Sequence, residues 1–116
     1  MNYGKELILD LHDCNIEKFT KKSLQKYFVQ LCDLIDMERV KVRWWEDFDQ
    51  TEPHLKGISA IQFIKTSNIT IHALELLQAV YVNIFSCKDF DPMKAKAFTE
   101  NWFGGKTVNF EVIDRI

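Results

Sequence analysis

The chain has 116 residues, of which 47% are hydrophobic and 28% are charged, and its formal net charge is -2. This length suits one ordinary buried core, so we expect a single domain over residues 1–116. A nearly neutral charge without a basic run argues against a nucleic-acid partner. The longest apolar stretches fall well short of the roughly 20 residues that a membrane-spanning helix requires, so no membrane is expected either.

The cysteine content favours a reducing compartment. Cys14, Cys32 and Cys87 form no CxxC pair, and an odd number of cysteines cannot all be bridged internally. The first residues show no basic segment followed by a long apolar one, so no signal peptide is expected. We therefore expect a cytoplasmic protein. No two histidines or cysteines have the spacing of metal ligands, and no metal is expected.

The first half of the chain predicts a strand, a helix and a second strand. Residues 5–11 form the first apolar run, and from Thr20 or Ser23 to about residue 35 the apolar residues recur at helical spacing. Residues 39–45 alternate between polar and apolar, as a half-buried strand does. Alternation also places Trp44 and Trp45 on opposite faces, one in the core and the other at an interface or a ligand wall.

The second half predicts a run of closely spaced strands, one helix and a last strand. The expected strands cover residues 57–65, 68–74 and 79–86, and their short connections favour antiparallel pairing. A helix begins at Asp91-Pro92 and ends at Gly104-Gly105, and residues 107–113 alternate as a strand. The order βαβββαβ implies an α+β two-layer sandwich, with a mainly antiparallel sheet and two helices on one face.

Three residues with chemically useful side chains stand at the ends of these short strands. These residues are Ser67 with its hydroxyl, His72 with its imidazole and Cys87 with its thiol. A β-meander would bring such strand ends together. Such a cluster can carry nucleophilic or acid–base chemistry. Taken singly, each has an ordinary structural explanation: Ser67 as a turn former, His72 as a partly buried strand histidine, and Cys87 as a small core residue.

Four segments carry a family resemblance. Gly57-Ile58-Ser59, Thr66-Ser67, Thr70-Ile71-His72 and Phe85-Ser86-Cys87 resemble, in order and spacing, the core of the bacterial and archaeal S-adenosylmethionine decarboxylases. The likeness covers most of the chain and is strongest from residue 57 to residue 87. Members of this family make a pyruvoyl cofactor from a serine of their own chain.

The resemblance implies self-cleavage between Thr66 and Ser67, which would give a β chain of residues 1–66 and an α chain of residues 67–116. The serine hydroxyl attacks the preceding carbonyl to give an ester, β-elimination leaves dehydroalanine, and hydrolysis leaves the pyruvoyl group. The substrate amine then condenses with that ketone, which accepts the electron pair released when carbon dioxide leaves. By resemblance, Cys87 returns a proton to the substrate, while His72 and Ser59 assist processing.

The chain departs from the family pattern around the cleavage serine and in the substrate-recognition segment. Thr66 and Asn68 stand where the family usually has Glu and His, and Ala73-Leu74-Glu75-Leu76 stands where it commonly has Thr-Trp-Pro-Glu. Pro53-His54 lies where the family carries a phenylalanine that stacks on adenine. Our candidates for substrate binding are therefore Glu75, Phe48 and Trp45.

The resemblance predicts a homodimeric, pyruvoyl-dependent decarboxylase of S-adenosylmethionine that serves spermidine synthesis. The departures leave two alternatives open. One keeps the pyruvoyl group and changes the small-molecule substrate to arginine or ornithine. The other is an unprocessed, non-catalytic homologue that acts as a binding or regulatory subunit.

Overall fold

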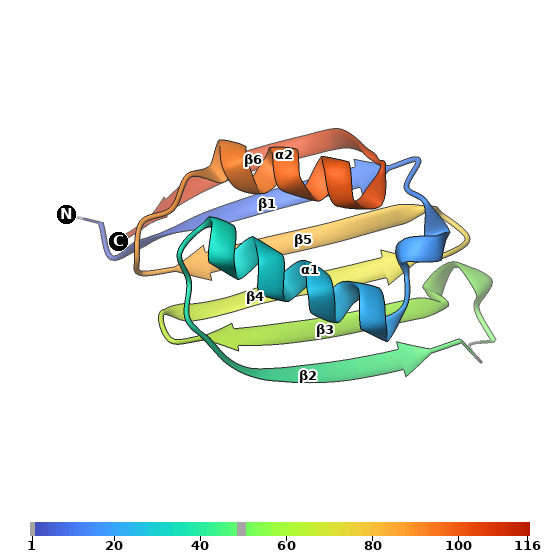
Figure 1. Cartoon of the computed structure of the whole chain (residues 1–116). Coiled ribbons are helices and arrows are strands. Elements are labelled where there is room, and N and C mark those ends of the chain that lie inside the picture. The colour runs from blue at the N-terminus through green and yellow to red at the C-terminus, as the bar shows by residue number, and fades with distance from the viewer. Residues whose placement is uncertain (1, 49–50) are drawn as a thin grey trace.

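The computed structural model describes residues 2–48 and 51–116, and all strands among these residues join into one antiparallel sheet. The sheet has six strands in the spatial order β2-β3-β4-β5-β1-β6 (Figure 1). In sequence order the strands are β1 (Gly4–His12), β2 (Arg39–Asp47), β3 (Gly57–Ile64), β4 (Ser67–Leu74), β5 (Ala79–Ser86) and β6 (Lys106–Arg115). Short 3-10 turns, η1 (Ile16–Lys18) and η2 (Pro53–Leu55), lie in two of the connections.

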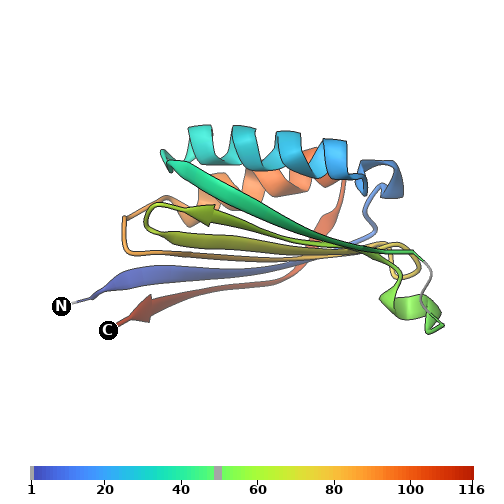
Figure 2. The same cartoon turned by 90° about the horizontal axis from the view of Figure 1, so that it is seen from below.

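Two helices cover one face of the sheet, and both begin at a side-chain cap. The helix α1 (Lys21–Leu34) follows Thr20, whose hydroxyl accepts a hydrogen bond from the N–H of Ser23 at 3.1 Å. The helix α2 (Pro92–Phe103) follows Asp91, and it ends at Gly104, which has a φ of 62°. Figure 2 shows both helices on the same side of the sheet, so the opposite face carries no covering layer.

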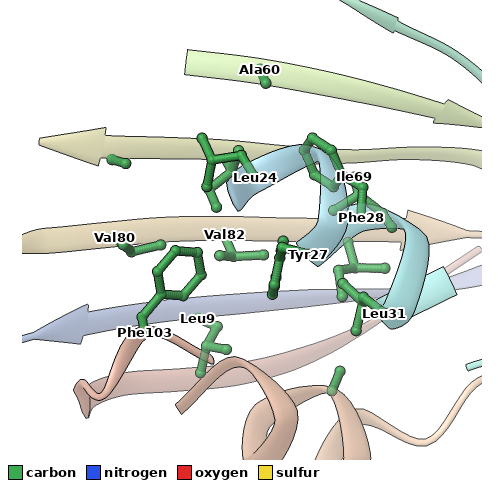
Figure 3. Packing of buried hydrophobic residues seen from close by; sticks show 14 of the residues in the cluster. Leu9, Leu24, Tyr27, Phe28, Leu31, Ala60, Ile69, Val80, Val82 and Phe103 are labelled. Carbon is green, nitrogen blue, oxygen red and sulfur yellow. The ribbon is translucent and has the colours of Figure 1, made fainter. Parts of the chain in front are cut away.

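The core lies between the helices and the sheet. From the sheet it takes every second side chain, among them Leu9 of β1, Ile69 of β4 and Val82 of β5, which are at most 2% exposed. From the helices it takes a cluster of rings around Tyr27, which is fully buried (Figure 3). The hydroxyl of Tyr27 lies 2.7 Å from that of Thr99, which donates to the carbonyl of Ala95, so this contact joins α1 to α2.

The expected architecture is confirmed, and the differences are small. The sheet is antiparallel throughout, both helices lie on one face, and every expected strand and helix forms within two residues of its expected ends. The expected order βαβββαβ is wrong by one strand, because four strands, not three, lie between the two helices and all of them join the sheet. The two tryptophans of β2 do point to opposite faces: Trp44 packs against the core and Trp45 is 68% exposed. No helix among the described residues is long and apolar enough to cross a membrane.

We expect Phe103→Ala to lower the free energy of unfolding by about 3–5 kcal/mol, because it removes a fully buried ring from between the helices and the sheet. The matched control is Val108→Ala in β6, where the side chain is 51% exposed and the change should stay within about 0.5 kcal/mol. Urea denaturation of both variants measures the difference. Equal losses would contradict this description of the core.

Candidate functional site

The strand register separates the candidate residues into two groups. In the β3–β4 ladder Ser59 pairs with His72, and at the other end of the same ladder Ile64 pairs with Ser67. Five residues of extended chain between Ser67 and His72 span about 17 Å. The expectation that one chain brings Ser67, His72 and Cys87 into a single cluster is therefore wrong.

The first group is the hydrogen-bonded pair of Ser59 and His72, on the face of the sheet that lacks helices. The hydroxyl of Ser59 lies 2.7 Å from Nδ1 of His72, so the imidazole is held by a neighbour across the ladder. A hollow of about 320 Å³ opens beside the pair, and Trp45 and Tyr81 form part of its wall. A histidine held by a hydroxyl and open to a hollow can exchange a proton with a bound molecule.

The second group surrounds the peptide bond between Thr66 and Ser67, at the turn from β3 to β4. The N–H of Cys87 donates to the carbonyl oxygen of Thr66 at 3.1 Å. The hydroxyl of Ser67 accepts a hydrogen bond from the side-chain amide of Asn68 at 3.2 Å. Ser67 has a φ of 154°, a value that residues other than glycine rarely adopt. An N–H aimed at a carbonyl oxygen stabilises the negative charge that gathers there when a nucleophile attacks.

A buried hydroxyl, that of Ser86, lies next to the side chain of Thr66. Ser86 is 0% exposed, and its Oγ lies 2.7 Å from Oγ1 of Thr66. The same oxygen accepts the N–H of Lys88 at 3.0 Å, and it lies 3.6 Å from the sulfur of Met37. Ser86 was not among the residues expected to form the site. Its signal was a polar residue at a helix-facing position of β5, where Val80, Val82 and Ile84 are apolar.

The three cysteines fall into different environments. Burial raises the pKa of the Cys14 and Cys32 thiols to about 11, so both stay protonated among the core residues. Cys87 is exposed, and it borders a hollow of about 210 Å³ with Tyr3 and Asp114. In the β4–β5 ladder Ser67 pairs with Ser86, the residue before Cys87, so the cysteine lies next to the candidate cleavage bond.

The substrate-binding candidates are not brought together. Trp45 lines the hollow beside His72, and its indole N–H donates to the carboxylate of Asp47 at 3.3 Å. Neither Phe48 nor Glu75 is among the described residues that line that hollow. Glu75 lies in the turn after β4, where its backbone N–H donates to the carbonyl of Lys56 at 3.1 Å. Within residues 2–48 and 51–116 no group of three or more His, Cys, Asp or Glu residues could hold a metal ion.

Comparison with known proteins identifies the family. The model of the S-adenosylmethionine decarboxylase family matches residues 5–116. The S-adenosylmethionine decarboxylase proenzymes of two Saccharolobus islandicus strains, L.S.2.15 / Lassen #1 and M.16.27, are each 27% identical over 115 residues, covering 97% of this chain and 88% of theirs. The crystal structure of the adenosylmethionine decarboxylase from Aquifex aeolicus shares the fold, with a TM-score of 0.79 at 16% identity over 98% of this chain and 91% of that one. A family match over nearly the whole chain, together with the antiparallel sheet and its two helices, shows that this chain belongs to the S-adenosylmethionine decarboxylase family, whose proenzymes use a self-derived pyruvoyl group.

Proposed function

We propose that the chain cleaves itself between Thr66 and Ser67 and then decarboxylates S-adenosylmethionine, which serves spermidine synthesis. The observation that carries this proposal is the hydrogen bond from the N–H of Cys87 to the carbonyl oxygen of Thr66, at 3.1 Å. It places a fixed donor on the one carbonyl that a hydroxyl of residue 67 would attack. Family membership supports the reaction class.

The residues at this turn suit the first step of self-processing. The Ser67 oxygen adds to the Thr66 carbonyl carbon, the peptide C–N bond breaks, and the residues become joined by an ester with a free amine on Ser67. During this step negative charge gathers on the Thr66 oxygen, where the Cys87 N–H already lies. The φ of 154° at Ser67 costs about 1–3 kcal/mol, and cleavage of the bond releases that strain.

The later steps need a base. A proton must leave the α-carbon of Ser67 so that the Thr66 carboxylate can depart from its β-carbon, and water then replaces the nitrogen, which leaves as ammonia. The remaining ketone supplies a carbonyl that takes up the electron pair released when carbon dioxide leaves the substrate. Within the described residues, the side-chain contact of the Ser67 hydroxyl is to the Asn68 amide, which is not a base.

A second copy of the chain can supply the imidazole. Ser59 and His72 lie on the face without helices, about 17 Å along the ladder from Ser67 in their own chain. That face also exposes the apolar side chains of Ile61 and Phe63, which are 38% and 42% exposed. Two copies packed through this face in opposite orientations would bring the Ser59–His72 pair of each near the Thr66–Ser67 bond of the other. The site would then be completed only in a homodimer.

Cys87 is the proposed proton donor to the α-carbon of the product. It is the one exposed thiol of the three and borders a hollow next to the cleavage bond. A thiol next to the reacting atoms can act as a general acid, which is what this step requires.

Trp45 is the proposed contact for the positively charged sulfonium of the substrate. It is 68% exposed and lines the hollow beside His72, where its ring face can attract a cation. Phe48 and Glu75 remain weaker candidates, since neither lines that hollow. The exposed ring of Trp45 also favours a second candidate function, because arginine and ornithine carry a cation as well. In that function the processed chain decarboxylates arginine or ornithine.

Processing and substrate are tested together. We expect the purified protein to give two fragments by intact mass spectrometry, broken before residue 67, with a pyruvoyl end on the later one. Processed protein should release carbon dioxide from carboxyl-labelled S-adenosylmethionine, and Ser67→Ala should abolish both cleavage and release because it removes the nucleophile. An intact chain without turnover would support the non-catalytic homologue, and release from arginine or ornithine alone would support the second candidate.

The composite site is tested by complementation. Ser67→Ala and His72→Ala chains with different tags are expressed separately and together. We expect the His72→Ala chain to stay intact alone and to be cleaved in the mixture, because its Ser67 meets the His72 of the other variant. If it stays intact in a mixed dimer as well, the imidazole does not come from a second copy.

The variant Cys87→Ser distinguishes the role of the Cys87 backbone N–H from the role of its thiol. The variant keeps the N–H that bonds Thr66, so we expect cleavage to proceed, while turnover falls by about 10²–10⁴-fold because a hydroxyl is a far weaker acid. Intact mass measures the cleavage and carbon dioxide release measures the turnover. Unchanged turnover would remove the thiol from the reaction.

A further inference from the structure

We propose that Ser86 is a positioning residue for self-cleavage: its buried hydroxyl holds Thr66 on one side and Lys88 on the other, and so keeps the N–H of Cys87 on the carbonyl oxygen of Thr66. This inference rests on the proposed function and goes beyond it, because Ser86 touches no reacting atom. The two hydrogen bonds are 2.7 Å to Oγ1 of Thr66 and 3.0 Å from the N–H of Lys88.

The position of Ser86 in its strand makes this hydroxyl unusual. Along β5 the helix-facing positions Val80, Val82 and Ile84 are apolar and at most 2% exposed, and Ser86 continues that row at 0%. A buried hydroxyl costs free energy unless it is hydrogen-bonded, so an apolar residue would suit the core better. Of the contacts that compensate for its burial, the two shortest are to Thr66, which carries the cleavage carbonyl, and to Lys88, which follows the donor Cys87, and the third is to the sulfur of Met37.

Ser86 acts on both partners of the hydrogen bond between Cys87 and Thr66. Cys87, the donor, lies in the chain between Ser86 and Lys88, and the bond from the Lys88 N–H to Ser86 Oγ fixes how the backbone turns through it. Thr66 carries the acceptor carbonyl, and its side-chain hydroxyl is hydrogen-bonded to the same Ser86 Oγ. One oxygen therefore sets the relative position of donor and acceptor. A misplacement of about 1 Å at a reacting group can cost about 10²-fold in rate.

The segment that follows α1 contacts this arrangement from the helix side. The sulfur of Met37 lies 3.6 Å from the hydroxyl oxygens of both Thr66 and Ser86. The ammonium of Lys88 donates to the carbonyl oxygen of Asp36 at 2.7 Å and to its carboxylate at 2.8 Å. The hydroxyl of Ser86 therefore contacts the β3–β4 turn, the segment after α1 and the chain that follows β5.

The test compares cleavage rates of newly made chains. Wild type, Ser86→Ala, Thr66→Val and the double variant are produced by cell-free translation, and the intact fraction is followed by mass spectrometry. We expect each single variant to be cleaved about 10–100-fold more slowly than wild type. Because both remove the same hydrogen bond, the double variant should be little slower than Ser86→Ala alone.

A buried hydroxyl elsewhere provides the matched control. Thr99 is 0% exposed and bonds Tyr27 between the helices, so Thr99→Val removes a comparable hydroxyl far from the cleavage bond. We expect it to lower the melting temperature and leave the cleavage rate unchanged. The pH dependence of cleavage should keep its midpoint in Ser86→Ala, since a positioning residue does not titrate.

The outcomes separate this inference from the proposed function. If wild type is never cleaved, the proposed function fails and the role of Ser86 fails with it. If wild type is cleaved and Ser86→Ala or Thr66→Val keeps pace with it, only the role of Ser86 is overturned. If Ser86→Ala does not fold, Thr66→Val at a half-buried position decides alone. Additive losses in the double variant would also overturn it, because the two hydroxyls would then act separately.

Discussion

The arrangement of this protein depends on the register of the β3–β4–β5 ladders. Pairing Ser59 with His72 and Ser67 with Ser86 fixes which groups meet, and it does so through backbone hydrogen bonds that involve no catalytic side chain. Because side chains alternate between the two faces of a strand, a slip of one residue would send each of these groups to the wrong face. The apolar side chains that face the helices hold the register in place, since a slip would expose all of them at once.

The two halves of the site differ in how they are built. The Ser59–His72 pair lies on the uncovered face, where an imidazole can reach another molecule. The Thr66–Ser67 bond lies at a strand end, with a backbone donor on its carbonyl and a buried hydroxyl behind it. The first half offers proton transfer and the second offers a poised peptide bond. The register keeps them apart within one chain, which is why we propose that a second copy completes the site.

Predictions from the sequence succeeded where the signal was local. Helical spacing with Thr20 and Asp91 as caps predicted both helices, and alternation predicted the opposite orientations of Trp44 and Trp45. The order and spacing of the four family segments predicted the family, which the comparisons confirm. The sequence did not single out Ser86. Its polar side chain interrupts the apolar row of β5, but nothing local shows that its hydroxyl meets Thr66 and Met37, which are distant in the chain.

The sequence by itself determined the order of the elements, the faces of the strands and the family, because these depend on periodicity, caps and motif spacing along the chain. Tertiary structure alone decided that Ser67 and Cys87 are neighbours, that His72 lies at the far end of the same ladder, and that Glu75 stays outside the hollow. The physical reason is that strand pairing and register couple residues far apart in the chain. No local sequence pattern shows which residues of one strand will pair with which residues of the next.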